Sequence, residues 1–259
     1  MLNNQDIKKI ILIVKEAGQI IMNYYHHYNF NVEQKGDNSP VTCADLEANN
    51  FICAKLKELF PNILIISEED VSNHHLLDES YQYFWSIDPL DATRSFIKKN
   101  GEFTINIGLI KDSKPSFGIV YSPLSKKLYY TDEKNIAYKQ IEEQEAQIIH
   151  TRAIPEEGAT IVVSESSITN NKLYAYLSDT KINQIIIFSS SLKICLIAEG
   201  EADIYLRLGN IMEWDTAAAH AILNSAGGSI KDLAGNDLTY GHKEKKYYNP
   251  EFIALGNNR

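Results

Sequence analysis

The sequence has few cysteines, no long hydrophobic run and no excess of positive charge. Its three cysteines, Cys43, Cys53 and Cys195, are scattered without paired spacing, which argues against a disulfide framework and against a zinc site. The longest purely aliphatic run, residues 10–14, is far too short to span a bilayer or to form the core of a signal peptide. We therefore expect a protein of the reducing cytoplasm that makes no stable membrane insertion.

Acidic residues outnumber basic ones, 34 against 25, which gives a formal net charge of −9. Binding to nucleic acid regardless of base sequence needs a basic surface, so we expect no nucleic-acid partner. A small phosphate ester is still compatible with this charge, provided that bound cations and a few well-placed Lys or Arg side chains meet it. The 259 residues, 44% of them hydrophobic, are enough for one large domain or two medium ones with a sizeable core.

The N-terminal third shows the spacing of two helices and two buried strands. Apolar residues recur at helical spacing over residues 6–28, and a second helix is expected from about residue 41 to Leu59. The polar segment at residues 35–40 between them is predicted to be an exposed, mobile loop. Residues 63–66 and the apolar run around Trp85 are predicted to be buried strands.

Two different patterns follow along the rest of the chain. An antiparallel meander is predicted for the strands at residues 103–110, 116–121 and 128–131. After about residue 145, alternating strands and helices predict a largely parallel sheet covered by helices. These strands are residues 160–164, 184–188 and 203–208, and the helices are residues 170–177, 191–200 and 215–226. We therefore expect an α/β protein in two parts, an α+β domain at residues 1–145 and an α/β domain at residues 146–259.

The most informative segment is Trp85-Ser86-Ile87-Asp88-Pro89-Leu90-Asp91-Ala92-Thr93. The apolar strand is predicted to end here in two carboxylates, and Pro89 fixes one backbone dihedral of the turn between them. Asp88, the Leu90 carbonyl and Asp91 could converge on a hard cation such as Mg²⁺, which prefers carboxylate and carbonyl oxygens. If the backbone after Asp91 opens a helix, its N–H groups suit a phosphate. The segment therefore predicts a corner that binds a metal and a phosphate.

Acidic residues also mark other places where strands end or helices begin. The full set is Asp45, Glu68, the pair Asp88 and Asp91, and Asp215. Each has a purely structural alternative: Thr42 and Asp45 match a capping box, Glu68 could be a solvated acid, and Asp215 could be a first-turn acid. Together they favour function, because a site for several Mg²⁺ ions needs carboxylates from different parts of the chain, gathered at strand ends and helix starts.

Four motifs occur in the order and spacing of the inositol monophosphatase superfamily, which the chain resembles over nearly its whole length. They are Lys35-x-Asp37-x-Ser39-Pro40-Val41-Thr42-x-x-Asp45, Ser67-Glu68-Glu69-Asp70, Asp88-Pro89-Leu90-Asp91-x-Thr93 and Trp214-Asp215-Thr216-Ala217-Ala218. The resemblance implies the layered αβαβα sandwich of inositol monophosphatases and sugar phosphatases.

Two further stretches resemble the bacterial CysQ-type 3′(2′),5′-bisphosphate nucleotidases, which remove the 3′-phosphate from adenosine 3′,5′-bisphosphate. They are Gly101-Glu102-Phe103-Thr104-Ile105-Asn106-Ile107 and Ser190-Ser191-Leu192-Lys193-x-Cys195-Leu196-x-Ala198-Glu199-Gly200. This second resemblance narrows the expected substrate from phosphate esters in general to a nucleotide that carries two phosphates.

The resemblance implies a role for each matched residue. The ligands of two or three Mg²⁺ ions would be Glu68, Asp88, the Leu90 carbonyl, Asp91 and Asp215, with Asp88 bridging two ions. Asp45 and the Thr93 hydroxyl would orient and deprotonate the attacking water, and the N–H groups of Ala92 and Thr93 would hold the scissile phosphate. Glu68, Leu90, Asp91 and Asp215 would also border the substrate. Such a displacement needs no covalent nucleophile, and the sequence shows no nucleophile elbow.

Lys193 and Arg207 are the candidates for binding the second phosphate or the ribose, because both fall in segments that resemble the nucleotidases. Arg207 is favoured, since a guanidinium pairs with phosphate through two parallel hydrogen bonds. The alternative for both is ordinary surface charge. His220 is interpreted as structural rather than as a ligand, since Mg²⁺ prefers oxygen.

Three positions depart from the pattern of the family. Ala92 stands where relatives usually have Gly, and a left-handed backbone at alanine would cost about 1–2 kcal/mol, whereas a helical one would cost almost nothing. Arg94-Ser95 replaces the usual Lys-Glu, and Glu213 adds a carboxylate beside Trp214 and Asp215. We expect these changes to alter affinity rather than to abolish activity.

The leading hypothesis is a Mg²⁺-dependent phosphatase, a monomer or homodimer, that acts on adenosine 3′,5′-bisphosphate and takes 3′-phosphoadenylyl sulfate as a second substrate. One alternative is an inositol monophosphatase or sugar-phosphate phosphatase with the same metal site. Another is a non-catalytic metal- or nucleotide-binding protein, degenerate at Ala92. Residues 190–200 and 205–208 favour the nucleotidase, and the presence of Asp45 with every implied ligand argues against a non-catalytic protein.

Overall fold

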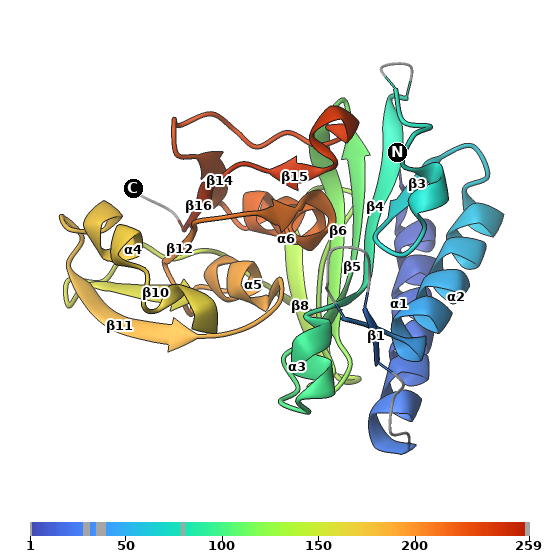
Figure 1. The fold of residues 1–259 in the computed structure, drawn as a ribbon, viewed down its shortest axis with the longest axis horizontal. Helices are drawn as coiled ribbons and strands as arrows, with labels where there is room; N and C mark the ends of the chain where they lie inside the picture. The colour runs from blue at the N-terminus through green and yellow to red at the C-terminus, as the bar shows by residue number, and fades with distance from the viewer. Residues whose placement is uncertain (1, 28–31, 35–39, 79–80, 257–259) are drawn as a thin grey trace.

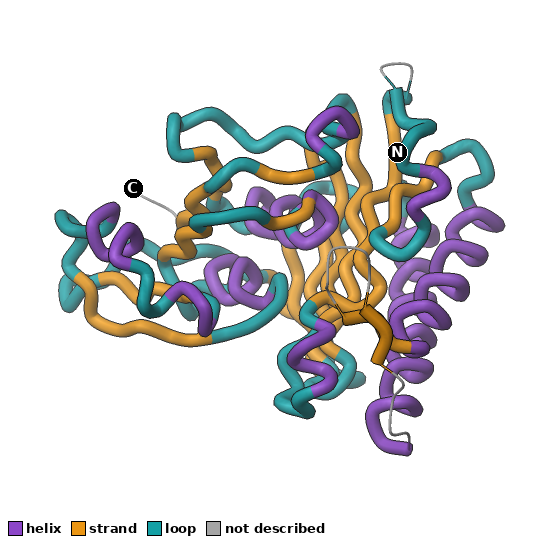
Figure 2. Tube along the Cα trace, viewed as in Figure 1, coloured by secondary structure: helices purple, strands orange, loops and turns teal. Residues whose placement is uncertain are grey.

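Helices and sheets stack in alternating layers (Figure 1). The structure, a computed structural model, describes residues 2–27, 32–34, 40–78 and 81–256, so the predicted mobile loop at residues 35–40 lies outside the described residues except for Pro40. Figure 2 shows two helices on the outside of a large sheet, a further helical layer behind that sheet, and then a second sheet. The expected layered αβαβα sandwich is confirmed.

The larger sheet has seven strands in the order β3-β4-β5-β6-β7-β8-β9. Their bounds are β3 Leu64–Ser67, β4 Tyr83–Asp91, β5 Thr104–Lys111, β6 Lys114–Ser122, β7 Lys127–Thr131, β8 Ala137–Ile141 and β9 Gln147–Ile148. Only β3 and β4 run parallel, and every later neighbour is antiparallel. The predicted meander is confirmed, and β8 and β9 extend it beyond the predicted strands.

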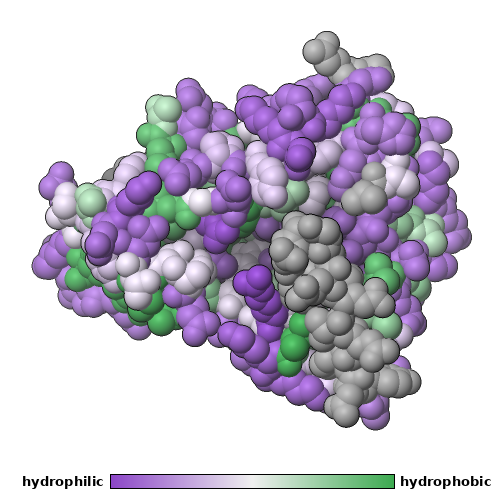
Figure 3. All heavy atoms as spheres, viewed as in Figure 1, coloured by the Kyte–Doolittle hydropathy of each residue, from purple (hydrophilic) through white to green (hydrophobic). Residues whose placement is uncertain are grey.

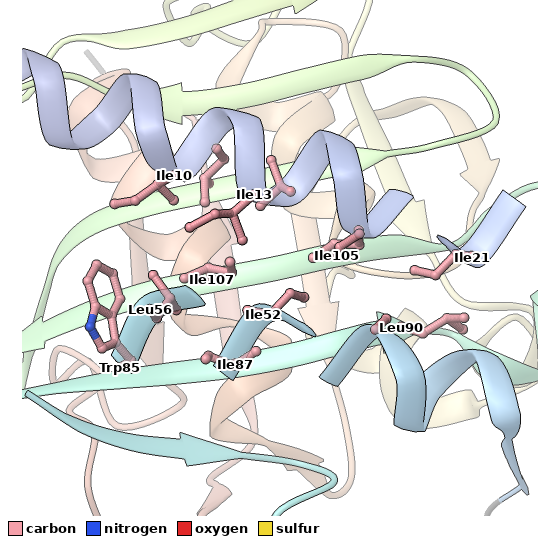
Figure 4. Close-up of a cluster of buried hydrophobic side chains, with 14 of the residues drawn as sticks. Ile10, Ile13, Ile21, Ile52, Leu56, Trp85, Ile87, Leu90, Ile105 and Ile107 are labelled. Atoms are coloured by element: carbon pink, nitrogen blue, oxygen red, sulfur yellow. The ribbon is translucent and has the colours of Figure 1, made fainter. Parts of the chain in front are cut away.

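Two amphipathic helices, α1 Asn4–His27 and α2 Cys43–Leu59, cover one face of this sheet. Figure 4 shows Ile10 and Ile21 of α1 and Leu56 of α2 directed toward strand residues such as Trp85 and Ile107. These side chains are all buried in one cluster, and each contributes about 1.5–3 kcal/mol through removal from water. This cluster holds in place the start of α2 and the strands that carry the site residues.

The smaller sheet has five strands in the order β11-β10-β12-β16-β14. Their bounds are β10 Ala159–Val163, β11 Ile182–Ile187, β12 Ile204–Arg207, β14 Ser229–Asp232 and β16 Phe252–Leu255. The prediction of a largely parallel sheet is confirmed for the three predicted strands, since β10 runs parallel to β11 and β12. The strand β16, which lies between β12 and β14 and runs antiparallel to both, was not predicted. After α6, the described chain returns to this sheet as two short strands, β14 and β16, with no α-helix between them. Strands of four residues show too little alternation for the sequence to predict their direction.

Three helices belong to the second part of the chain: α4 Asn171–Tyr176, α5 Leu192–Ala198 and α6 Ala217–Ser225. Figure 1 shows α5 and α6 between the two sheets, and α6 packs on β5 and β6 of the larger one. The approach is so close that a side chain at Gly118 would meet the Ala218 carbonyl oxygen at 2.0 Å. Because the two parts share this layer, the division at residue 145 stays a prediction.

Short elements complete the described chain and frame the site. The strand pairs are β1 Val32–Gln34 with β2 Pro40–Thr42 and β13 Ile211–Met212 with β15 Tyr248–Asn249, the short helix is α3 Thr93–Ile97, and the 3₁₀ turns are η1 Val71–Asn73, η2 Glu165–Ser167, η3 Glu213–Asp215 and η4 Lys243–Lys245. Among the described helices, none combines the length and apolarity needed to cross a membrane. Hydrophilic residues cover most of the face drawn in Figure 3.

Candidate active site

The two central carboxylates lie on a strand rather than in a turn. β4 ends at Asp91, so the strand ends in the two carboxylates as predicted, but the turn predicted between them does not occur. The pairing with β5 slips between Asp88 and Asp91, which places Pro89 and Leu90 in a bulge. Such an irregularity tolerates Pro89, which has no N–H to donate, and it re-aims the neighbouring side chains. The Leu90 N–H donates to Asp88 Oδ1 at 3.0 Å, which fixes the orientation of this buried carboxylate.

Three acidic side chains from distant parts of the chain meet at this bulge. The carboxylates of Glu68, Asp88 and Asp215 offer oxygen atoms that all lie within 4.8 Å of one another. Glu68 follows β3, and its N–H donates to the Ile87 carbonyl at 3.1 Å, which aligns it with β4. Asp215 ends η3, where its Oδ2 accepts from the Met212 N–H at 3.2 Å. The sequence motifs therefore converge in space, and we call these three residues the carboxylate cluster.

Asp91 lies beside the carboxylate cluster and is held by a different set of partners. Its Oδ2 accepts from the Ser191 N–H at 2.6 Å and from Asn106 Nδ2 at 3.2 Å. It also lies 3.3 Å from the Thr104 hydroxyl. Burial raises the pKa of Asp91, and Lys193 and the hydrogen bonds from Ser191 and Asn106 oppose that rise. These bonds hold the side chain in one orientation.

Burial and like charges both oppose ionisation in the carboxylate cluster. Burial raises the pKa of Asp215 well above its ordinary value, and the neighbouring charges of Asp91 and Glu68 raise it further. Two unit charges within 4.8 Å repel by about 3 kcal/mol at an effective dielectric constant of about 20. All the donors are oxygens, as Mg²⁺ requires. A divalent cation would relieve this repulsion, so the residues present suit the metal that the sequence implies.

Asp45 takes part both in the capping box of α2 and in a contact with the Thr93 hydroxyl. Its Oδ2 accepts from the Thr42 N–H at 2.9 Å and from the Thr42 hydroxyl at 2.6 Å, and Thr42 in turn caps α2. Its Oδ1 accepts from the Thr93 hydroxyl at 3.1 Å. Asp45 is 1% exposed, so one buried carboxylate closes the capping box and contacts the hydroxyl beside the carboxylate cluster.

Ala92 adopts the left-handed conformation, with φ 68° and ψ 51°. It is the N-cap residue of α3, and its carbonyl accepts from the N–H groups of Ser95 and Phe96. Of the two backbone conformations weighed for Ala92, left-handed and helical, the left-handed one therefore occurs. An alanine in this conformation costs about 1–2 kcal/mol.

Replacing Ala92 with Gly is expected to raise the free energy of unfolding by about 0.5–1 kcal/mol. The relief of left-handed strain exceeds the extra entropy of glycine in the unfolded chain, which costs about 0.5–1 kcal/mol. Urea denaturation of the parent and the variant measures the difference. Lys246→Gly is a matched control, because exposed Lys246 also has a positive φ, of 53°, and should gain similarly. A less stable Ala92→Gly protein beside a more stable Lys246→Gly protein would contradict the strain.

A cleft of about 440 Å³ opens beside the carboxylate cluster. Glu68, Asp91 and Asp215 line it, and so do Arg94 and Ser95, two of the positions that depart from the family pattern. Both predicted substrate-binding cations, Lys193 and Arg207, line the same cleft. The structure therefore places the acidic and basic candidates around one space.

Lys193 is buried, which excludes the alternative of ordinary surface charge for this residue. It is 6% exposed, and its ammonium donates to the Ser190 carbonyl at 2.6 Å. Burial lowers the pKa of Lys193 to about 8, although the nearby Asp91 carboxylate opposes that shift. Arg207 is half-buried, and its Nη2 donates to the Asn210 carbonyl at 2.6 Å.

Sequence reasoning missed a buried polar network that connects the two parts of the chain. The Ser191 hydroxyl lies 2.7 Å from Asn106 Oδ1 and 2.9 Å from the Thr104 hydroxyl, and all three side chains are buried. Together with the Ser191 N–H bond to Asp91, these contacts fix the start of α5 against β5. Polar residues within the otherwise apolar strand at residues 104–111 were the available signal.

A second missed residue, His74, connects the loops that carry Glu68 and Asp215. One of its ring nitrogens, Nε2, lies 2.6 Å from the Ser67 carbonyl oxygen. Its ring centroid lies 5.3 Å from that of Trp214 and 5.1 Å from that of Tyr247. No motif identified His74, since the contact depends on how η1 folds back over the sheet.

Glu213 and His220 are both structural. Glu213 accepts from the N–H groups of Gly241 and His242 at 2.6 and 3.0 Å, so it fixes a turn and does not add to the carboxylate cluster. His220 Nδ1 lies 2.8 Å from the Tyr240 hydroxyl, and burial lowers the pKa of His220 to about 4. The expectation that Glu213 alters affinity has no contact to support it.

Comparison with known proteins places this arrangement in a family. The sequence matches the inositol monophosphatase family over residues 3–254. The chain belongs to the inositol monophosphatase family. Within this family, the sequence is similar to that of a 3′(2′),5′-bisphosphate nucleotidase, CysQ, of Salmonella typhimurium. The two are 39% identical over 247 residues, which cover 95% of this chain and 98% of the relative.

Other members of the inositol monophosphatase family agree with this placement. The CysQ bisphosphate nucleotidase of Buchnera aphidicola is 40% identical over 250 residues, 96% of this chain and 92% of the relative. The crystal structure of CysQ from Bacteroides thetaiotaomicron superimposes with a TM-score of 0.82 at 33% identity, covering 97% of both chains. An IMPase of Thermotoga maritima, 22% identical with a TM-score of 0.75 over 95% of this chain and 89% of that one, shares the fold.

Proposed function

We propose that this chain is a Mg²⁺-dependent phosphatase that removes the 3′-phosphate from adenosine 3′,5′-bisphosphate and accepts 3′-phosphoadenylyl sulfate as a second substrate. The similarity to CysQ bisphosphate nucleotidases over nearly the whole chain supports the reaction. The observation that carries the proposal is the meeting of Glu68, Asp88 and Asp215 within 4.8 Å beside a cleft. A purely structural role would leave this repulsive arrangement without a purpose.

In this proposal, two or three Mg²⁺ ions bind among the acidic side chains. Their ligands are Glu68, Asp88, the Leu90 carbonyl, Asp91 and Asp215. Bound Mg²⁺ lowers the pKa of water and neutralises negative charge on the phosphate. Asp88 is the proposed bridging ligand, because it is buried and already held by the Leu90 N–H.

The residues around the metal ligands position the water and the phosphate. The Thr93 hydroxyl is within reach of Asp45 Oδ1 at 3.1 Å and of the Leu90 carbonyl oxygen at 3.3 Å. Asp45 therefore receives the proton of the attacking water at Oδ1, and Thr93 orients that water. The N–H groups of Ala92 and Thr93, at the left-handed turn into α3, hold the scissile phosphate.

Lys193 and Arg207 bind the second phosphate or the ribose in this proposal. Both line the cleft, and backbone carbonyls orient both cations. A cation fixed in this way loses little side-chain entropy when an anion binds. Two anchored cations in the same cleft as an acidic cluster match a ligand that carries two phosphates.

The proposal extends to the cellular setting. We propose a cytoplasmic enzyme that acts as a monomer or homodimer, with a small nucleotide as its ligand. The three cysteines, all described as free thiols, fit a reducing compartment. The excess of acidic residues argues against a nucleic-acid partner.

Parallel assays of phosphate release from adenosine 3′,5′-bisphosphate, 3′-phosphoadenylyl sulfate and inositol 1-phosphate test the proposal. We expect hydrolysis of both nucleotides with Mg²⁺, little hydrolysis of the inositol ester, and no hydrolysis in EDTA. A preference for inositol 1-phosphate would keep the metal site and overturn the substrate. Activity that persists in EDTA would overturn the metal assignment.

A further inference from the structure

The wall of the cleft contains two buried polar atoms with unused hydrogen-bonding capacity. The Tyr205 hydroxyl and Arg207 Nε find no hydrogen-bond partner within the described part of the chain. Both residues line the cleft, and Tyr205 is 1% exposed. A buried hydroxyl that lacks a partner costs stability. Its retention at this place is explained if a ligand supplies the missing acceptor.

The fold holds the Tyr205 ring rigidly and brings it close to both cations. Tyr205 and Arg207 are two residues apart on β12, so their side chains leave the same face of the strand. The ring packs edge-on against Phe252, with centroids 5.6 Å apart, and the Lys193 ammonium lies 5.3 Å from its centroid. Tyr205 thus lies next to both cations, Lys193 across its ring and Arg207 on the same face of β12.

Charged residues that line the cleft act on the Tyr205 hydroxyl. Burial raises the pKa of Tyr205 to about 12, the charge and the nearby N–H groups of Arg207 oppose this shift, and Asp91 and Asp215 add to it. Those three charged residues all border the cleft. At neutral pH the phenol therefore keeps its proton, and it can donate that proton in a hydrogen bond to an anionic ligand.

We propose that the Tyr205 hydroxyl donates a hydrogen bond to the second phosphate of the substrate and makes the enzyme selective for nucleotides that carry two phosphates. This inference rests on the proposed function, in which the carboxylate cluster receives the scissile phosphate. The second phosphate then lies beside Lys193 and Arg207, which line the same cleft. Phosphate oxygens are strong acceptors, and two cations beside the hydroxyl favour them over a neutral ribose hydroxyl.

The variant Tyr205→Phe tests the inference, because it deletes one oxygen and keeps the ring. We expect KM for adenosine 3′,5′-bisphosphate to rise about ten- to a hundredfold, the usual worth of a hydrogen bond to a charged group. KM for adenosine 3′-monophosphate, which lacks the second phosphate, should stay unchanged. An equal loss on both substrates, or no loss on either, would overturn the inference.

The melting temperature distinguishes this role from a structural one. Because the Tyr205 hydroxyl makes no hydrogen bond to any residue that the structure describes, Tyr205→Phe should melt at or above the temperature of the parent. Tyr129→Phe is the matched control, since the equally buried Tyr129 hydroxyl donates to Glu199 at 2.8 Å. We expect that control to melt at a lower temperature and to keep the selectivity of the parent. A lower melting temperature for Tyr205→Phe would contradict the inference.

Binding without turnover separates this inference from the proposed function. If the parent fails to hydrolyse adenosine 3′,5′-bisphosphate, the proposed function fails. Calorimetric titration with adenosine 5′-monophosphate, which carries only the second phosphate, needs no turnover. The inference predicts binding to the parent that is about ten- to a hundredfold weaker in Tyr205→Phe. Equal affinity of the parent and Tyr205→Phe for adenosine 5′-monophosphate would overturn the inference, whether or not the parent hydrolyses adenosine 3′,5′-bisphosphate.

Discussion

Replacing Asp45 with Asn is expected to lower the rate of phosphate release about 10²–10⁴-fold, the usual contribution of a positioned general base. The carboxylate lies 3.1 Å from the Thr93 hydroxyl beside the carboxylate cluster. An amide keeps the size of the side chain and loses the capacity to take a proton. Steady-state kinetics at saturating Mg²⁺ would measure the loss, and we expect it in kcat rather than in KM.

Thr42→Ala separates the two functions of Asp45. The Asp45→Asn change also disturbs the capping box of α2, because Oδ2 accepts two hydrogen bonds from Thr42. Thr42→Ala disturbs the same cap and should cost about 0.5–2 kcal/mol of stability. It leaves Asp45 Oδ1 and Thr93 in place, so its activity should stay close to that of the parent. If both variants lost activity equally, the cap rather than the base would explain the effect.

Replacing Asp88 with Asn should abolish Mg²⁺-dependent activity and stabilise the metal-free protein. Loss of a bridging ligand is expected to lower the rate about a thousandfold or more, since metal ions contribute several kcal/mol to phosphoryl transfer. In EDTA, the change removes one of three carboxylates that lie within 4.8 Å of one another. The amide can still accept from the Leu90 N–H and can donate to Asp215, which shares a side-chain hydrogen bond with Asp88, so the main change is lost repulsion.

Thermal denaturation with and without Mg²⁺ measures both effects of Asp88→Asn. We expect the parent to gain stability from Mg²⁺ and the variant to gain little, because binding to the native state alone shifts the melting temperature. Asp203→Asn is the matched control, since buried Asp203 pairs with Arg152 at 2.9 Å, and its loss should destabilise the protein. If Asp88→Asn lowered the melting temperature in EDTA as Asp203→Asn does, the carboxylate cluster would be a structural network.

Most of the fold could be predicted because its elements have strong periodicity or clear ends. The capping box at Thr42 set the start of α2, and the meander followed from alternating strands bounded by turn residues. The antiparallel β16 was missed because four residues, Phe252–Leu255, are too short to indicate direction. The bulge at Pro89 and Leu90 was not predicted, because proline argues for a turn unless a partner strand can accommodate a bulge.

The motifs identified the acidic part of the site, but they could not show which side chains lack partners. Glu68, Asp88 and Asp215 come from strand ends and a 3₁₀ turn, where position in sequence indicates position in space. The burial of Lys193 and the unpartnered hydroxyl of Tyr205 depend on packing between α5 and β12. Such contacts between distant segments leave no local pattern in the sequence.

The regiochemistry of the reaction tests the central claim most directly. The protein would be incubated with adenosine 3′,5′-bisphosphate and either Mg²⁺ or EDTA, and the nucleotide product would be identified by phosphorus-31 NMR. The account predicts adenosine 5′-monophosphate and inorganic phosphate with Mg²⁺, and unchanged substrate with EDTA. Adenosine 3′-monophosphate as the product, or unchanged substrate with Mg²⁺, would contradict a site in which the carboxylate cluster receives the 3′-phosphate.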